Sequence, residues 1–192
     1  MLLENKEIRL RAIEPNDLEQ LYIWENNPDI WMVGNTRQPY SKFILKQYII
    51  NSGQDIYENK QLRLMLIDKA TEKAVGTVDL FDFDMHHSRI SLGLFVDKEF
   101  QGKGYAKSAL HLVEDYVFNF LQIYQLYCNI AETNTVSRKM FENEGYEANG
   151  ILKNWIKTPE GFDNIIVFQR FKKKKMIQDG EAVKQTETSK RS

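Results

Sequence analysis

The sequence has a single cysteine and no apolar run of the roughly 18 residues that a membrane-spanning helix needs. One cysteine, Cys128, excludes a disulfide within the chain and fits a reducing compartment. Residues 1–16 carry charges where a signal peptide needs an apolar centre. We therefore expect a cytoplasmic protein without a membrane partner.

The chain also lacks an excess of charge of one sign. Its 26 basic and 27 acidic residues nearly cancel, which argues against nucleic acid as a partner. Its 192 residues, 42% of them hydrophobic, suffice for one sizeable core. We predict a single domain at residues 1–171 and a polar, flexible tail at residues 172–192, because no aromatic residue follows Phe171.

Residue patterns predict the elements of the first half of the chain. Residues 8–13 alternate apolar and basic side chains, which is typical of a half-buried strand. Two helices follow, one capped by Asn16 or Asp17 and one capped by Ser41, and the stretch around Trp31 is expected to be irregular. Residues 61–67, 74–83 and 90–96 have the pattern of three strands joined by turns.

The second half begins with a loop at residues 101–106 and a long amphipathic helix that reaches Leu121. Residues 125–131 are almost continuously apolar, which predicts a central strand covered on both faces. Asn134 or Thr135 is expected to cap a short helix that ends at Gly145. Residues 150–157 and 163–171 have the pattern of a final hairpin. The predicted order is β-α-α-β-β-β-α-β-α-β-β.

The loop at residues 101–106 follows a strand and opens a helix, an arrangement that binds anions through free N–H groups and the helix dipole. The phosphate-binding sequence G-x-x-x-x-G-K-[ST] is absent, and Lys107 stands where a dinucleotide fingerprint needs its third glycine. The loop does match Gln/Arg-x-x-Gly-x-Gly/Ala through Gln101, Gly104 and Ala106. A phosphate-bearing ligand other than those two nucleotide classes is therefore expected.

A second motif follows at a suitable separation. Its pattern is N-x-x-S/A-x-x-x-Y/F-x-x-x-G-F/Y, which is met by Asn134, Ser137, Phe141, Gly145 and Tyr146. With these two motifs, residues 6–171 resemble the GNAT superfamily of N-acetyltransferases. The resemblance implies an α/β (α+β) GNAT fold, in which helices cover both faces of a mixed, mostly antiparallel sheet of about seven strands.

The resemblance also implies an activity. A GNAT enzyme transfers the acetyl group of acetyl-CoA, its co-substrate, to a primary amine by direct attack on the thioester, without a metal. The alternative is a CoA-binding GNAT-like module with weak or no catalysis. The runs F-Q-G-K-G-Y-A and L-Y-C-N-I-A-E-T-N look most like the branch that holds spermidine and ribosomal-protein alanine acetyltransferases. The acceptor stays open between a small amine or polyamine and a protein N-terminus, and a homodimer or higher homo-oligomer is compatible with the sequence.

The resemblance further implies that the fourth and fifth strands part and expose backbone groups to the pantetheine arm. Glycines in the loop would let backbone N–H groups surround the pyrophosphate. For the cations Lys103, Lys107 and Arg138, a solvated surface position is an equal alternative. The expected cofactor-binding residues are Leu94, Phe95, Val96, Gln101, Gly102, Lys103, Gly104, Tyr105, Ala106, Asn134, Ser137 and Arg138.

Catalysis needs a base, because an alkylamine with a pKa of about 10.4 is mostly protonated at neutral pH. Asp82 and Asp84, at the end of the third strand, are the candidate bases, with a polar strand face or turn as their alternative role. Many relatives carry a Glu on the fourth strand, where this chain has Ser91. The Tyr that protonates the CoA sulfur in many relatives corresponds to Phe141, which cannot donate a proton. Cys128 is expected to be a buried small residue rather than a nucleophile.

The acceptor is expected to meet the first two helices and the final hairpin. These helices offer acidic and aromatic side chains suited to a cationic amine, although an ordinary solvated helix face is the alternative. The side chains are those of Glu19, Tyr22, Trp24, Glu25, Asp29 and Trp31. His86 and His87 have a suitable intrinsic pKa for proton transfer, but surface turn positions are the commoner case.

Overall fold

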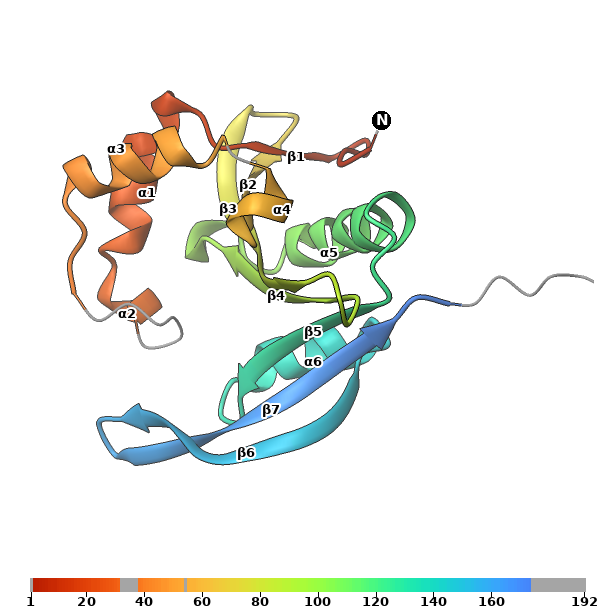
Figure 1. Cartoon of the computed structure of the whole chain (residues 1–192). Helices are drawn as coiled ribbons and strands as arrows, with labels where there is room; N and C mark the ends of the chain where they lie inside the picture. The colour runs from red at the N-terminus through yellow and green to blue at the C-terminus, as the bar shows by residue number, and fades with distance from the viewer. Residues whose placement is uncertain (1, 32–37, 54, 174–192) are drawn as a thin grey trace, which may run out of the picture.

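The computed structural model of the chain describes residues 2–31, 38–53 and 55–173 (Figure 1). The strands are β1 (Ile8–Ala12), β2 (Leu62–Asp68), β3 (Lys73–Asp84), β4 (Arg89–Val96), β5 (Gln125–Ala131), β6 (Glu147–Thr158) and β7 (Gly161–Phe171). The helices are α1 (Leu18–Glu25), α2 (Pro28–Trp31), α3 (Lys42–Asn51), α4 (Ile56–Asn59), α5 (Tyr105–Asp115) and α6 (Thr135–Asn143). Short 3-10 turns lie at Pro15–Asp17 and Lys98–Phe100, and a π-helical turn at Tyr116–Phe120 continues α5. Nearly all of the predicted tail lies outside the described residues.

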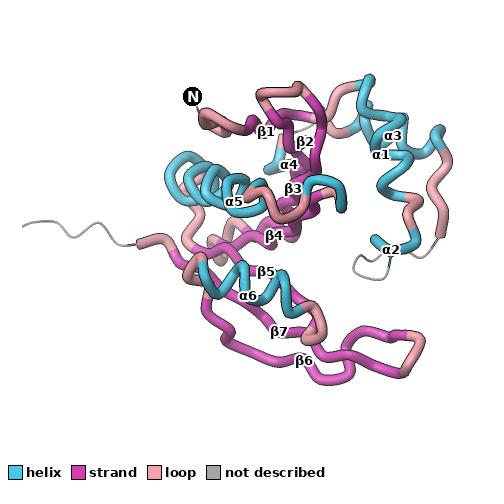
Figure 2. The backbone as a smooth tube through the Cα atoms, turned by 180° about the vertical axis from the view of Figure 1, so that it is seen from behind, coloured by secondary structure: helices cyan, strands magenta, loops and turns pink. Residues whose placement is uncertain are grey.

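All seven strands belong to one sheet in the order β1-β2-β3-β4-β5-β7-β6. Among the strands that the structure describes, only the β4–β5 pair is parallel; the other neighbours are antiparallel. Figure 2 shows α5 and α6 on the same side of the sheet. The mixed, mostly antiparallel sheet that the sequence predicts, with helices on both faces, is confirmed.

The alternation of side chains along β2 divides the core into two parts. Leu64 and Leu66 point into the larger cluster, which includes residues of α5 and α6. Met65 and Ile67 point to the opposite face, where they pack with Trp24 of α1 and residues of α3. Because successive side chains in a strand point to opposite faces, the strand residues that face α1 and α3 follow from this register.

Two predicted caps are present, and two single-turn helices were missed. The hydroxyl of Ser41 accepts the N–H of Ile44 at 3.2 Å, and the Asn134 carbonyl oxygen accepts the N–H of Ser137 at 3.1 Å. The stretch around Trp31 forms α2 rather than an irregular segment, and α4 was not predicted. A helix of four residues is too short to display helical periodicity in the sequence.

Strand β5 differs from its prediction because only one of its faces is fully covered. Leu126, Cys128 and Ile130 are buried, whereas Asn129 is exposed and Tyr127 is half-buried. Helices α1 and α3 lie beside the other half of the sheet (Figure 1), so they leave this face of β5 open. The prediction of a strand covered on both faces is therefore wrong.

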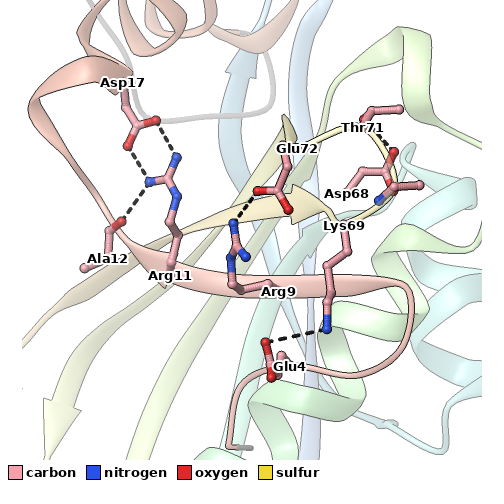
Figure 3. A network of polar contacts seen from close by, with 10 residues as sticks. Glu4, Arg9, Arg11, Ala12, Asp17, Asp68, Lys69, Thr71 and Glu72 are labelled. Atoms are coloured by element: carbon pink, nitrogen blue, oxygen red, sulfur yellow. Dashed lines mark hydrogen bonds and ion pairs between the residues drawn. The ribbon is translucent and has the colours of Figure 1, made fainter.

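Ion pairs fasten the edge strand β1 to its surroundings (Figure 3). Arg11 donates to both carboxylate oxygens of Asp17, at 2.6 and 2.8 Å, and the N–H of Glu14 donates to the same carboxylate at 2.8 Å. Burial of Asp17 opposes its ionisation, but these hydrogen bonds outweigh burial and hold its pKa below the ordinary value. By contrast, the Arg9–Glu72 pair is solvent-exposed, with 62% of the Glu72 side chain accessible.

We expect Asp17→Asn to lower the free energy of unfolding by about 1–3 kcal/mol at pH 7, because the neutral amide cannot replace the charged carboxylate that accepts from Arg11. Folding lowers the pKa of Asp17, so the contribution of the carboxylate is complete above a pH of about 4 and is lost as the pH falls through the lowered pKa. Urea unfolding should therefore show a difference that narrows below that pH. The control is Glu72→Gln, which breaks an exposed pair and should change stability little. Equal losses of unfolding free energy in both variants would show that the Arg11–Asp17 pair stabilises the fold no more than the exposed pair does.

Candidate functional site

The loop between β4 and α5 presents free backbone donors to solvent. Gly102 and Gly104 have φ angles of 75° and 84°, a left-handed conformation that glycine adopts without strain. A Cβ atom on either glycine would meet no heavy atom within 4 Å, so the space in front of the loop is open. Among the described residues, the N–H groups of Gly102, Lys103 and Gly104 have no protein acceptor. The loop can therefore surround an anion at the N-terminus of α5.

Side-chain contacts hold this loop in place. The amide of Gln101 donates to the carbonyl of Val96 at 3.0 Å, which ties the loop to the end of β4. Burial and the nearby carboxylate of Asp68, the last residue of β2, raise the pKa of the Tyr105 phenol, so this side chain contacts β2. The ammonium of Lys103 lies 5.1 Å from the centre of the Phe100 ring. Gln101 and Tyr105, two of the predicted cofactor residues, thus connect the loop to β4 and β2.

Trp24 anchors α1 to the same end of β4. Its indole N–H donates to Asp97 at 2.6 Å, and its ring meets the Phe95 ring edge-on at 5.3 Å between centroids. Only 4% of Trp24 is exposed. The sequence offered Trp24 as an acceptor contact, but the structure shows a buried anchor.

Strands β4 and β5 part beside this loop. Their pairing ends at Ser91 and Tyr127, so residues 92–96 have no partner on the β5 side. On the side of β5, a groove of about 730 Å³ lies between the start of α6 and the β6–β7 hairpin. It is lined by Ala131, Thr133, Asn134, Ile156, Thr158, Glu160, Phe162 and Asp163. The predicted residues Leu94, Phe95 and Val96 thus lie on a free strand edge that leads to the glycine loop.

The second motif occupies the start of α6. Asn134 uses its carbonyl oxygen to cap the helix at Ser137. Arg138 donates to the carbonyl of Glu132 at 2.9 Å, while its Nε is buried and has no described hydrogen-bond partner. Phe141 is buried and packs edge-on against Tyr146, with 4.9 Å between ring centroids. The face of α6 that meets the sheet is therefore apolar at Phe141.

The structure separates the two candidate bases. The carboxylate of Asp84 accepts hydrogen bonds from the backbone N–H and from Nδ1 of His87, each at 2.9 Å, and forms an ion pair with Arg89 at 3.0 Å. The backbone N–H of His87 and its ring lower the pKa of Asp84 to about 2, which makes Asp84 a weak base. Asp82 is exposed in a bulge of β3, with a φ of 51°. Burial, and after it the nearby charge of Asp82, raises the pKa of the Tyr127 phenol.

The sequence did not predict the polar pairs near the parting point. Ser91 pairs with Tyr127 in register and is fully buried. Asp79 pairs with Gly93 on the free part of β4 and binds Arg63 of β2. Only the strand register brings these residues together, so no local pattern could have identified them.

The remaining residues that the sequence singled out lie at several places around the sheet. Cys128 is buried as expected, and burial raises the pKa of its thiol to about 12, which leaves no reactive thiolate. Lys107 forms an ion pair with Glu144 at 2.8 Å, and Lys42 forms one with Glu19 at 2.7 Å. The side chain of Asp29 lies outside the described residues.

Two general properties complete the description. In the part of the chain that the structure describes, no three His, Cys, Asp or Glu side chains come together as metal ligands. Within the same ranges, no helix has the length and apolar character that crossing a membrane requires.

Comparison with known proteins agrees with this geometry. The sequence profile described as an acetyltransferase (GNAT) domain matches residues 7–147. The chain therefore belongs to the GNAT acetyltransferase family. It is an N-acetyltransferase that uses acetyl-CoA as its co-substrate.

Relatives and solved structures add detail. The spermidine N(1)-acetyltransferase of Vibrio cholerae serotype O1 is 27% identical over 151 residues, which cover 77% of this chain and 83% of that protein. The structure of spermidine N-acetyltransferase from Vibrio cholerae with CoA and spermine has a TM-score of 0.78 at 24% identity, and covers 88% of this chain and 97% of that one. The ribosomal-protein-S5-alanine acetyltransferase of Vibrio fischeri has a TM-score of 0.77 at 18% identity, with 88% and 95% covered. The GNAT fold is thus confirmed, and these similar proteins include both kinds of enzyme in the predicted branch.

We expect Gly104→Glu to abolish acetyl-CoA binding without unfolding the chain. The new carboxylate would stand in the open space before the free N–H groups and repel the pyrophosphate, and the φ of 84° would strain a residue with a Cβ. Calorimetric titration with acetyl-CoA measures the effect, and thermal unfolding checks the fold. Gly161→Ala is a matched control, since it also has a positive φ, of 140°, and open space around it. Unchanged affinity in Gly104→Glu would show that the loop is not the pyrophosphate site.

Proposed function

We propose that the acceptor is a polyamine or a related small aliphatic amine with more than one ammonium group. The observation that carries the proposal is the parting of β4 and β5 beside the glycine loop, because a thioester in that gap can be reached from the face of α1 and α3. This face holds the carboxylates of Glu25 and Asp79. The Vibrio cholerae relative, whose name specifies spermidine, supports the same acceptor class.

The reaction begins with an amine that has lost its proton. Its nitrogen lone pair attacks the carbonyl carbon of the thioester, the C–S bond breaks, and the sulfur leaves with the electron pair. A thiol with a pKa of about 8.5 makes the thiolate a tolerable leaving group near neutral pH. Phe141 is buried and has no proton to give to this sulfur, so in this proposal solvent supplies the proton after the sulfur departs.

For the base, we propose Asp82. Its exposed carboxylate has none of the described hydrogen bonds that stabilise the anion of Asp84, and it lies close to Tyr127 at the parting point. The residues proposed to hold acetyl-CoA are those of the free edge and the loop, namely Leu94, Phe95, Val96, Gln101, Gly102, Lys103, Gly104, Tyr105 and Ala106, with Asn134, Ser137 and Arg138 at α6.

A thiol-release assay tests the activity and the acceptor class together. We expect CoA thiol to appear when acetyl-CoA is mixed with the protein and spermidine, spermine or 1,4-diaminobutane, and to appear much more slowly with peptides that carry a free N-terminus. The buried thiol of Cys128 leaves the readout free of a signal from the folded protein. Faster release with peptides would reverse the acceptor assignment. Acetyl-CoA binding without release by any amine would instead support a CoA-binding module.

We expect Asp82→Asn to lower kcat for the best amine by roughly a hundredfold or more, as the loss of a general base does. The KM for acetyl-CoA should stay unchanged. Asp82 lies on β3 opposite the start of β4, whereas the loop follows the end of β4. Asp84→Asn provides the comparison. Its kcat should fall less, since the Asp84 carboxylate is already engaged by the backbone N–H and the ring of His87 in the turn. An unchanged kcat in Asp82→Asn would exclude it as the base.

A further inference from the structure

A half-buried charge cluster lies on the face of the sheet that α1 and α3 cover. Arg63 of β2 donates through Nε to Asp79 of β3 and through Nη1 to Glu25 at the end of α1. The exposed fractions of the three side chains are 23%, 25% and 20%. The ring of Tyr48 on α3 lies 5.6 Å from the guanidinium carbon. Four elements thus meet around one arginine.

The cluster carries more negative than positive charge. Burial opposes the protonation of Arg63, but the charges of Asp79 and Glu25 outweigh burial and raise its pKa, so the guanidinium stays charged. Among the described residues, two carboxylates therefore share a single cation. Partly desolvated carboxylates interact more strongly with a cation than surface carboxylates do. A second cation would balance the charge of this cluster.

The cluster also reaches the gap between β4 and β5. Asp79 pairs in register with Gly93, which lies two residues beyond Ser91, the last residue of β4 that pairs with β5. A side chain at position 93 would contact Asp79 and Phe81 at 3.5 Å, so the glycine keeps this side of β4 bare. The carboxylate of Asp79 thus borders the route from the face of α1 to the gap, and Glu25 lies farther along the same face.

We infer that Glu25, Arg63 and Asp79 form the binding site for an ammonium group of the acceptor, with Arg63 as the residue that positions both carboxylates. The inference rests on the proposed function and narrows it. Two carboxylates stabilise the protonated form of an amine, whereas the attacking nitrogen must be neutral. The ammonium held here is therefore the distal one, and the site selects acceptors with a second cation over monoamines.

The test compares two acceptors that differ only in the distal cation, 1,4-diaminobutane and butylamine. In Asp79→Asn and Glu25→Gln, we expect the KM for 1,4-diaminobutane to rise by about ten- to a hundredfold, the size of a lost charge-assisted hydrogen bond. The KM for butylamine and the KM for acetyl-CoA should change little. The ratio of kcat/KM values for the two acceptors should therefore fall towards one.

Controls separate this inference from the proposed function. Glu72→Gln also removes a carboxylate that pairs with an arginine, but at the far edge of the sheet, and should keep the ratio of the wild-type protein. If the wild-type protein acetylates no amine, the proposed function fails. If it acetylates diamines and both cluster variants keep the wild-type ratio, the cluster only joins α1 to the sheet and the inference is overturned. If Asp79→Asn does not fold, as thermal unfolding would show, Glu25→Gln decides alone.

Discussion

The parallel pairing of β4 and β5 covers only three residue pairs, and the position of the site depends on this limit. Each strand is held by its other neighbour, since β4 pairs along its length with β3 and β5 pairs along its length with β7. The sheet can therefore open at its centre without losing either strand. The backbone groups that face the opening need other partners, because an unpaired buried N–H or C=O costs about 1–3 kcal/mol. A ligand that lies along β4 can supply those partners.

The loop extends this free edge towards a bound anion. Its glycines adopt left-handed backbone conformations, and the helix that follows contributes its dipole. Contacts with two other parts of the chain hold the ends of this loop region, namely Trp24 of α1 at Asp97 and Asp68 of β2 at Tyr105. The position of the loop relative to the gap therefore depends on contacts between distant segments as well as on the motif itself.

The sequence could predict what local chemistry determines. The strands, the two main helices of the first half, the caps at Ser41 and Asn134 and the glycine loop all follow from patterns within a few residues. The missed features depend on contacts between distant segments. Strand β5 looked covered on both faces because its composition is apolar, yet which face is open depends on where α1 and α3 pack.

The same limit explains the catalytic candidates. Asp82 and Asp84 are two residues apart and look equivalent in the sequence, but the turn at His87 uses one of them and leaves the other exposed. Likewise, Arg63 and Asp79 look like ordinary surface charges in the sequence, and Glu25 is one of several acidic residues in the first helices. Their combination appears only when the β2–β3 register places Arg63 opposite Asp79 and the end of α1 brings Glu25 beside them.

The two faces of the opened sheet carry different side chains, and this difference bears on the side from which the acceptor approaches. On the side of α5 and α6, Phe141 packs edge-on against Tyr146, and both lie with Cys128 in the larger apolar cluster. On the side of α1 and α3, carboxylates border the gap from β3. In the proposed function, proton removal and acceptor binding take place on this face. An amine that approaches from that face would then meet acidic groups before it meets the thioester, and this order would favour acceptors that carry a positive charge.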